Sequence, residues 1–129
     1  MLARSLAFLF LGLLLAGCGP ARLNETKTLE LTSEIQARSL DLPAVSKPQK
    51  INIEFSSSDK EVDVLVFKDE DVKSDDDLAY AASSKALGKM KGEKGTFTVD
   101  VPENTKTRVV ARLGPAKKSN VKITVTNAP

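Results

Sequence analysis

The stretch EVDVLVF, residues 61–67, decides the fold. The valines at every second position, from Val62 to Val66, share one face of an extended strand. Alternation with a period of two is typical of a β-strand that packs one face on a core. Leu65 and Phe67 lie on the opposite face, so we expect this strand to be buried on both sides.

The same alternation recurs along the rest of the chain. The apolar positions that share a face are Leu29 and Leu31; Ile51, Ile53 and Phe55; Phe97, Val99 and Val101; Val109, Ala111 and Leu113; and Val121, Ile123 and Val125. Arg108, Val110 and Arg112 point the other way. Turn residues such as Gly114-Pro115 separate these runs. This pattern predicts an all-β fold, a small antiparallel β-sandwich of about six to eight strands.

Two of these strands resemble a known family. VDVLVF (62–67) is similar to the central strand of the pre-peptidase C-terminal domains of secreted bacterial proteins, and GTFTVDV (95–101) is similar to another strand of that family. The resemblance covers roughly residues 50–126. It implies a small β-sandwich that acts as a non-catalytic accessory or binding module.

The segment from Ser74 to Gly95 breaks the strand pattern. Leu78, Ala82 and Ala86 recur at a spacing of four after an acidic start, and Gly88 follows them. One interpretation is a short helix, over about residues 77–87, that one of the aspartates caps. The other is an irregular strand followed by a loop rich in lysine and glycine.

The first residues have the layout of an export signal. A basic Arg4, an apolar run over residues 6–15 and small residues precede Cys18, the only cysteine. The apolar run is shorter than the roughly 20 residues that span a bilayer. Leu15-Ala16-Gly17-Cys18 resembles the lipobox of bacterial lipoproteins. An ordinary secretory signal and an uncleaved anchor are the alternatives.

The lipobox resemblance implies diacylglycerol on the Cys18 thiol, an acyl chain on its amino group, and a membrane-anchored protein. We therefore expect a signal peptide at 1–17, the lipidated cysteine and a flexible tether at 18–27, and the sandwich at 28–129. Residue 19 is Gly rather than Asp, which by analogy with enterobacterial lipoproteins favours the periplasmic face of the outer membrane over the inner membrane.

The composition restricts the chemistry. The chain has no histidine, and its single cysteine is assigned to the lipid, which excludes a Ser-His-Asp triad, a Cys-His pair and a His-based zinc site from this chain alone. A disulfide is excluded for the same reason. We expect no enzymatic activity. Few aromatic residues and an export signal also argue against nucleic-acid binding.

A dense group of carboxylates lies between residues 68 and 77. Asp69, Asp71, Asp75 and Asp77 are spaced closely enough to supply oxygen ligands to a calcium ion. The EF-hand pattern fails here, because Lys73 and Ser74 occupy positions that the pattern gives to a ligand and to glycine. A solvated acidic loop is the alternative interpretation.

Lysines dominate the stretch GKMKGEKG, residues 88–95. Lys89, Lys91 and Lys94 are candidates for contact with a membrane surface or an anion, and a solvated hairpin loop is the alternative. Charge is also uneven on a larger scale. Residues 54–77 hold ten acidic and three basic residues, and residues 85–122 hold ten basic and three acidic residues. One interpretation is a basic face toward anionic lipid with an acidic face outward. The other, which we favour, is that these segments pair as neighbouring strands.

Together these features predict a lipid-anchored, non-catalytic binding or structural module of the cell envelope, with a protein or glycan as partner. The alternative function is binding of a small ligand or of calcium through the acidic loop at residues 69–77. The sequence does not indicate an oligomeric state.

Overall fold

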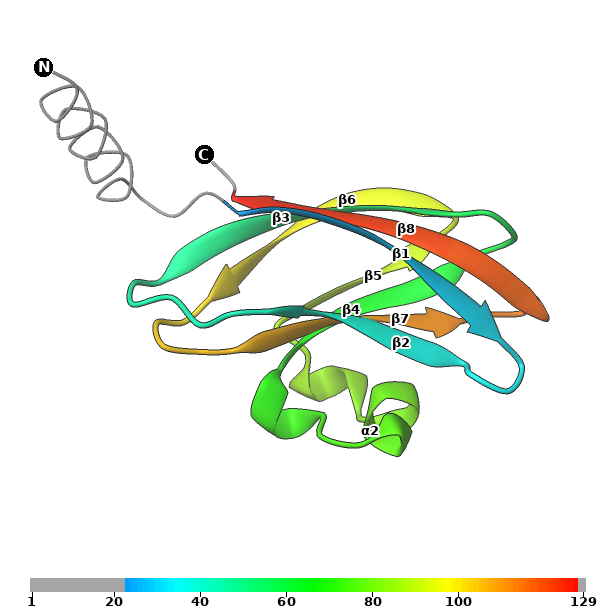
Figure 1. The fold of residues 1–129 in the computed structure, drawn as a ribbon, viewed down its shortest axis with the longest axis horizontal. Helices are drawn as coiled ribbons and strands as arrows, with labels where there is room; N and C mark the ends of the chain where they lie inside the picture. The colour runs from blue at the N-terminus through cyan, green and yellow to red at the C-terminus, as the bar shows by residue number, and fades with distance from the viewer. Residues whose placement is uncertain (1–22, 128–129) are drawn as a thin grey trace, which may run out of the picture.

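The computed structural model describes residues 23–127, which form two four-stranded antiparallel sheets packed face to face (Figure 1). The first sheet has the order β1-β8-β3-β6, with the bounds Asn24–Thr32, Lys118–Asn127, Gln49–Ser57 and Lys94–Val101. The second has the order β2-β7-β4-β5, with the bounds Ala37–Leu42, Thr107–Leu113, Val62–Lys68 and Gly88–Gly92. The prediction of an antiparallel β-sandwich is confirmed.

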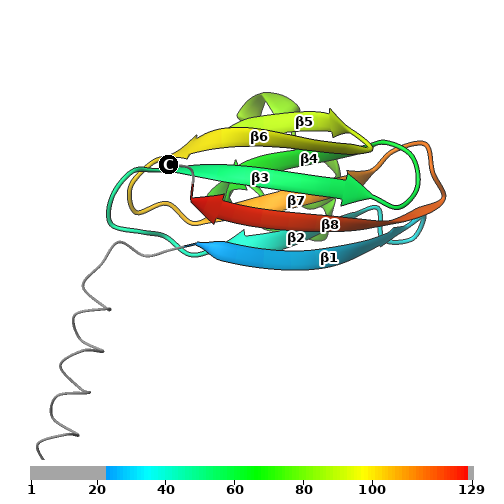
Figure 2. The same ribbon diagram turned by 90° about the horizontal axis from the view of Figure 1, so that it is seen from above.

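The edge strands of the two sheets lie above one another. Figure 2 shows β1 over β2 along one side of the sandwich and β6 over β5 along the other. The main core fills the space between the sheets. Its fully buried residues include Leu31, Ile51, Val64 and Ile123, all from the predicted apolar faces, whereas Phe97 stays partly exposed.

A second, smaller core lies on the outer face of the β2-β7-β4-β5 sheet. Leu65 and Phe67 on β4 and Val110 on β7 pack there against Val72 and Leu78. The covering segment consists of a 3₁₀ turn η1 (Asp69–Asp71), the helix α2 (Asp75–Tyr80) and a second turn η2 (Ser83–Lys85). The expectation that β4 is buried on both faces is confirmed.

The helix exists, but it differs in detail from the predicted one. Ser74, not an aspartate, is its N-cap: the Ser74 Oγ accepts from the Asp77 N–H at 3.1 Å, and the Asp77 carboxylate accepts from the Ser74 N–H. This reciprocal capping box satisfies two main-chain donors. α2 ends at Tyr80, so Ala82 and Ala86 lie beyond it.

Two boundaries correct the sequence analysis. β1 begins at Asn24 and pairs with β8 from there, so residues 24–27 belong to the sandwich and not to the tether. Residues 88–95 are not a loop, because β5 and β6 occupy them with a tight connection at Glu93. The short strand β2 was also not anticipated. Residues 1–22, with the predicted signal, lie outside the described residues.

The two oppositely charged segments pair, as expected. Asp63 on β4 faces Arg112 on β7 and Lys91 on β5, and Arg108 on β7 bonds Asp69 at 2.8 Å. The pairing brings charges of opposite sign together across adjacent strands. Within residues 23–127, no helix is long and apolar enough to cross a membrane.

Candidate binding groove beside α2

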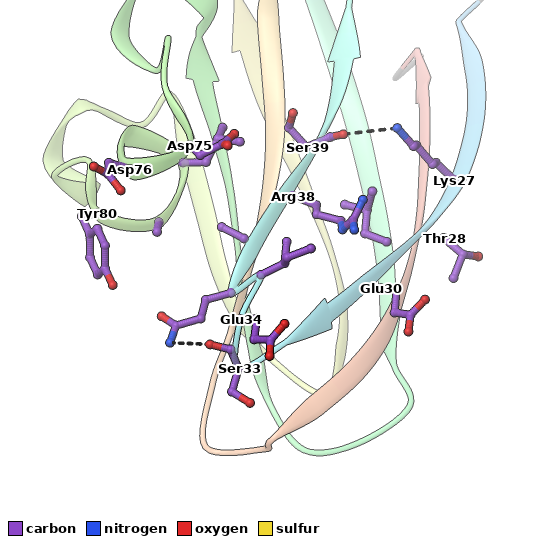
Figure 3. Close-up of a pocket in the computed structure, with 16 residues that line it drawn as sticks. Lys27, Thr28, Glu30, Ser33, Glu34, Arg38, Ser39, Asp75, Asp76 and Tyr80 are labelled. Atoms are coloured by element: carbon purple, nitrogen blue, oxygen red, sulfur yellow. Dashed lines mark hydrogen bonds between the residues drawn. The ribbon is translucent and has the colours of Figure 1, made fainter.

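A groove of about 800 Å³ runs along the side of the sandwich where β1 lies over β2 (Figure 3). Consecutive residues of both edge strands line it, over 27–30 in β1 and 37–39 in β2. The turn between these strands closes one end, and α2 forms the wall on the side of β2. Below, these lining residues together are called the α2 groove.

The exposed apolar side chains gather in this groove. Among the described residues, Ile35 and Tyr80 are the large apolar side chains that remain exposed, at 44% and 74% of their surface. Both line the α2 groove, although they lie 45 positions apart in the sequence. Tyr80 is also the only tyrosine of the chain. Exposed apolar side chains that cluster in a concave site are typical of a binding surface.

Charged groups surround these two side chains. The lining holds two cations, Lys27 and Arg38, and four carboxylates, Glu30, Glu34, Asp75 and Asp76, so its net charge by count is −2. Figure 3 shows Asp75, Asp76 and Tyr80 on the helix and Arg38 on β2. The groove therefore combines apolar contact area with hydrogen-bonding groups of both signs.

Local hydrogen bonds hold the closed end of the groove. The Thr32 N–H donates to the Ile35 oxygen at 2.9 Å, and the Ile35 N–H donates to Thr32 Oγ1 at 3.0 Å. The Gln36 amide nitrogen donates to the Ser33 oxygen at 3.4 Å. This turn fixes the main chain beside Ile35, so its apolar side chain is presented at the surface by an ordered segment.

Arg112 fastens α2 to the sheet. From β7 its guanidinium donates to the Leu78 oxygen at 2.7 Å and to the Ala81 oxygen at 2.9 Å, and it lies 5.5 Å from the centre of the Phe67 ring. Burial lowers the pKa of Arg112, and the nearby Asp63 opposes that shift. Arginine stays protonated in proteins, so the clamp persists at physiological pH. Arg112 thereby positions Tyr80 at the groove.

The four aspartates of the calcium hypothesis, Asp69, Asp71, Asp75 and Asp77, have different surroundings in the structure. Asp69 accepts from Arg108, and Asp77 serves the capping box of α2. Asp75 lines the α2 groove, whereas Asp71 does not. Within residues 23–127, no three acidic, histidine or cysteine side chains come together as a metal site would require. The alternative function of calcium binding therefore rests on the sequence alone.

The lysines of the anion hypothesis lie on strands. Lys89, Lys91 and Lys94 are all exposed. Lys89 donates to Ser83 Oγ at 3.4 Å, and Lys91 lies 3.8 Å from a Glu61 oxygen. Lys94 starts β6, directly after the connection at Glu93. These contacts use two of the three lysines within the fold. Cys18 lies outside the described residues.

Sequence reasoning missed most of the α2 groove. Of its charged residues, only Asp75 was singled out beforehand. Ile35 and Tyr80 come from a turn and a helix end, and no local motif marks either of them. The only sign in the sequence is that each is a large apolar residue in or beside a polar stretch: Ile35 in SEIQ (33–36) and Tyr80 at the end of DLAY (77–80). Single exposed apolar residues are too common to identify a site without the fold.

No protein-family profile and no curated protein matches this sequence. Several solved structures share its fold. The periplasmic inhibitor of g-type lysozyme PliG from Aeromonas hydrophila superposes with a TM-score of 0.61 at 13% identity, over 84% of this chain and 89% of that one. The pre-peptidase C-terminal domain of a collagenase from Bacillus anthracis superposes with a TM-score of 0.55 at 13% identity, over 80% and 89% of the two chains. The expected likeness to this second kind of sandwich is thus confirmed at the level of fold.

Proposed function

We propose that this protein is a lipid-anchored, non-catalytic binding module of the bacterial cell envelope, and that the α2 groove binds a protein or glycan partner. The observation that carries this proposal is the position of Ile35 and Tyr80. Both exposed large apolar side chains of the described residues line one groove. A surface tyrosine is a frequent hot spot of protein interfaces, because it combines apolar area with a polar tip.

Two further observations support a binding role. The carboxylates of the groove can accept hydrogen bonds from a basic side chain or from sugar hydroxyls. The similar sandwich from A. hydrophila is a periplasmic inhibitor of g-type lysozyme, so this architecture is compatible with a protein partner.

The length of the tether supports a position close to the membrane. Leu23, the first described residue, follows Cys18 by five positions. An extended chain of that length reaches at most about 18 Å. A lipid on Cys18 would thus hold the end of the sandwich that carries Asn24 beside the bilayer. By the strand register the turn at Glu93 lies toward the opposite end, so Lys91 and Lys94, which flank this turn, would lie away from that membrane.

The test is affinity capture from native envelopes with the full chain carrying a C-terminal tag. Wild-type protein is compared with a variant carrying Ile35→Ser and Tyr80→Ala. The matched control carries Thr96→Ala and Thr98→Ala, two exposed positions on β6. We expect wild type and control to capture the same partner and the groove variant to lose it. Equal capture by all three proteins would refute the role of the groove.

A further inference from the structure

The strand β2 has a free edge that opens into the α2 groove. β2 is the outermost strand of its sheet and pairs only with β7. In an antiparallel ladder, the main-chain groups of successive residues point alternately toward the partner strand and away from it. Which residues of β2 point outward therefore follows from one ladder bond.

One ladder bond sets this alternation, and one side-chain bond agrees with it. The Gln36 oxygen accepts from the Leu113 N–H of β7 at 2.8 Å, so the even-numbered residues of β2 face β7. The Ser39 oxygen instead accepts from the Lys27 side chain on β1 at 3.5 Å, so the odd-numbered residues face outward. The outward set consists of Ala37, Ser39 and Asp41. Ala37 and Ser39 line the α2 groove.

We propose that an extended, basic segment of a protein partner adds as a further strand to the outward edge of β2 and lies in the α2 groove; this inference rests on the proposed function. The N–H and C=O groups of Ala37, Ser39 and Asp41 are not used by β7, and they match what an added strand provides. A glycan would leave this regular array of donors and acceptors unmatched.

The walls of the groove specify the side chains of the added strand. Its alternate residues would point to opposite sides of the sheet. One set would lie beside α2, where Tyr80 offers apolar contact and Asp75 and Asp76 offer two carboxylates. With four carboxylates against two cations in the lining, charge complementarity favours lysine or arginine in that set.

Lys27 occupies one main-chain acceptor of this edge, the Ser39 oxygen. Exposed lysines on edge strands hinder unwanted strand pairing. Lys27 is exposed and its bond to the Ser39 oxygen is long, so a partner strand can displace it.

The test uses a library of random peptides of about ten residues, close to the upper length of a typical strand, selected on the full wild-type chain in detergent. The most enriched peptide is then the probe. Its affinity is measured for wild type, for Ser39→Pro and for Ser39→Ala. Proline removes the outward N–H, which β7 does not use, whereas alanine keeps it. We expect Ser39→Pro to weaken binding about tenfold or more and Ser39→Ala to change it less than about threefold.

A second measurement leaves the protein unchanged, because Ser39→Pro can also disturb folding. Two peptides are made with N-methyl groups on alternate amides, one in each register. An added strand uses the N–H groups of only one register. We expect one methylated peptide to lose binding about tenfold or more and the other to keep it. Equal effects of the two registers would overturn the proposal.

Glycan probes separate this proposal from the proposed function. An oligosaccharide that binds wild type, is lost with Tyr80→Ala and is unaffected by Ser39→Pro would overturn strand addition and leave the binding groove intact. If no peptide and no oligosaccharide depends on Ile35 or Tyr80, both proposals fail.

Discussion

Arg112 and Leu78 join the sheet to the helix that walls the groove: the Arg112 side chain donates to the Leu78 main-chain oxygen at 2.7 Å. A second bond to the Ala81 oxygen follows at 2.9 Å. Together they bind two carbonyl groups at the C-terminal end of α2, on either side of Tyr80 in the sequence. A planar guanidinium can donate in two directions at once, and a lysine cannot reproduce this geometry.

Arg112→Lys is therefore expected to lower the free energy of unfolding by about 1–2 kcal/mol, the range for hydrogen bonds to a charged group that is partly exposed. Urea unfolding measures this loss. Hydrogen exchange should also show faster opening of residues 75–81, whereas the β3–β8 pairing should keep its protection. An unchanged exchange rate over α2 would mean that Arg112 does not hold the helix.

Leu78→Ala tests the packing of the same helix. Leu78 is 7% exposed and packs in the small outer core with Leu65, Phe67 and Val110. Truncating a buried leucine costs about 2–5 kcal/mol, and a small core under a short helix relaxes easily. We expect a loss near the lower limit, measured by urea unfolding. A loss below about 0.5 kcal/mol, as at exposed sites, would contradict the packing described.

Gly114→Ala is expected to destabilise the sandwich by about 1–3 kcal/mol, because an added Cβ would meet the main-chain oxygen of Glu61, which cannot move without shifting the strand connection. Gly92→Ala is the matched control, since its Cβ would lie 3.3 Å from the Lys94 oxygen. Thermal unfolding compares the two variants. A larger loss for Gly92→Ala would show that the approach of Gly114 to Glu61 is not limiting.

Calcium is expected to leave the Tm unchanged, because Asp69 and Asp77 are engaged within the fold and no three carboxylates come together within residues 23–127. A ligand that binds the native state raises stability with its concentration. Thermal unfolding in rising calcium measures this directly. A rise in Tm that Asp71→Asn with Asp75→Asn abolishes would restore the calcium hypothesis.

The lipid anchor has its own test. Labelled palmitate should be incorporated into the full wild-type chain and not into Cys18→Ala, since the lipobox resemblance assigns the lipid to that thiol. Wild type should also fractionate with membranes. Incorporation of label into the Cys18→Ala chain would contradict the assignment.

The strands with regular apolar alternation could be predicted from the sequence. EVDVLVF even showed that β4 is covered on both faces, although not which segment covers it. β2 and β5 could not be found in this way. ARSLDL alternates apolar residues only at Leu40 and Leu42, too short a run to mark a strand, and GKMKG holds two glycines, which strands disfavour. Pairing with β7 and β4 stabilises them, and that is a tertiary effect.

The α2 groove was harder to predict for the same reason. Ile35 and Tyr80 line one groove because the turn after β1 carries the chain to β2 in the other sheet, and because Arg112 fixes α2 beside β2. Neither arrangement can be recognised from a short stretch of sequence, because each depends on contacts between segments that are far apart in the chain. The acidic run drew attention to Asp69 and Asp77, whose roles are structural, while Asp76 was not singled out and lines the groove.

The central claim is that the α2 groove contacts a partner in the envelope. The most direct measurement replaces Tyr80 with a photo-reactive benzoylphenylalanine in the full, membrane-targeted chain and irradiates living cells. The same replacement at Thr98, exposed on β6 in the other sheet, is the control. We predict a discrete crosslinked product from position 80 and none of that size from position 98. The same product from both positions, or none from position 80, would contradict this claim.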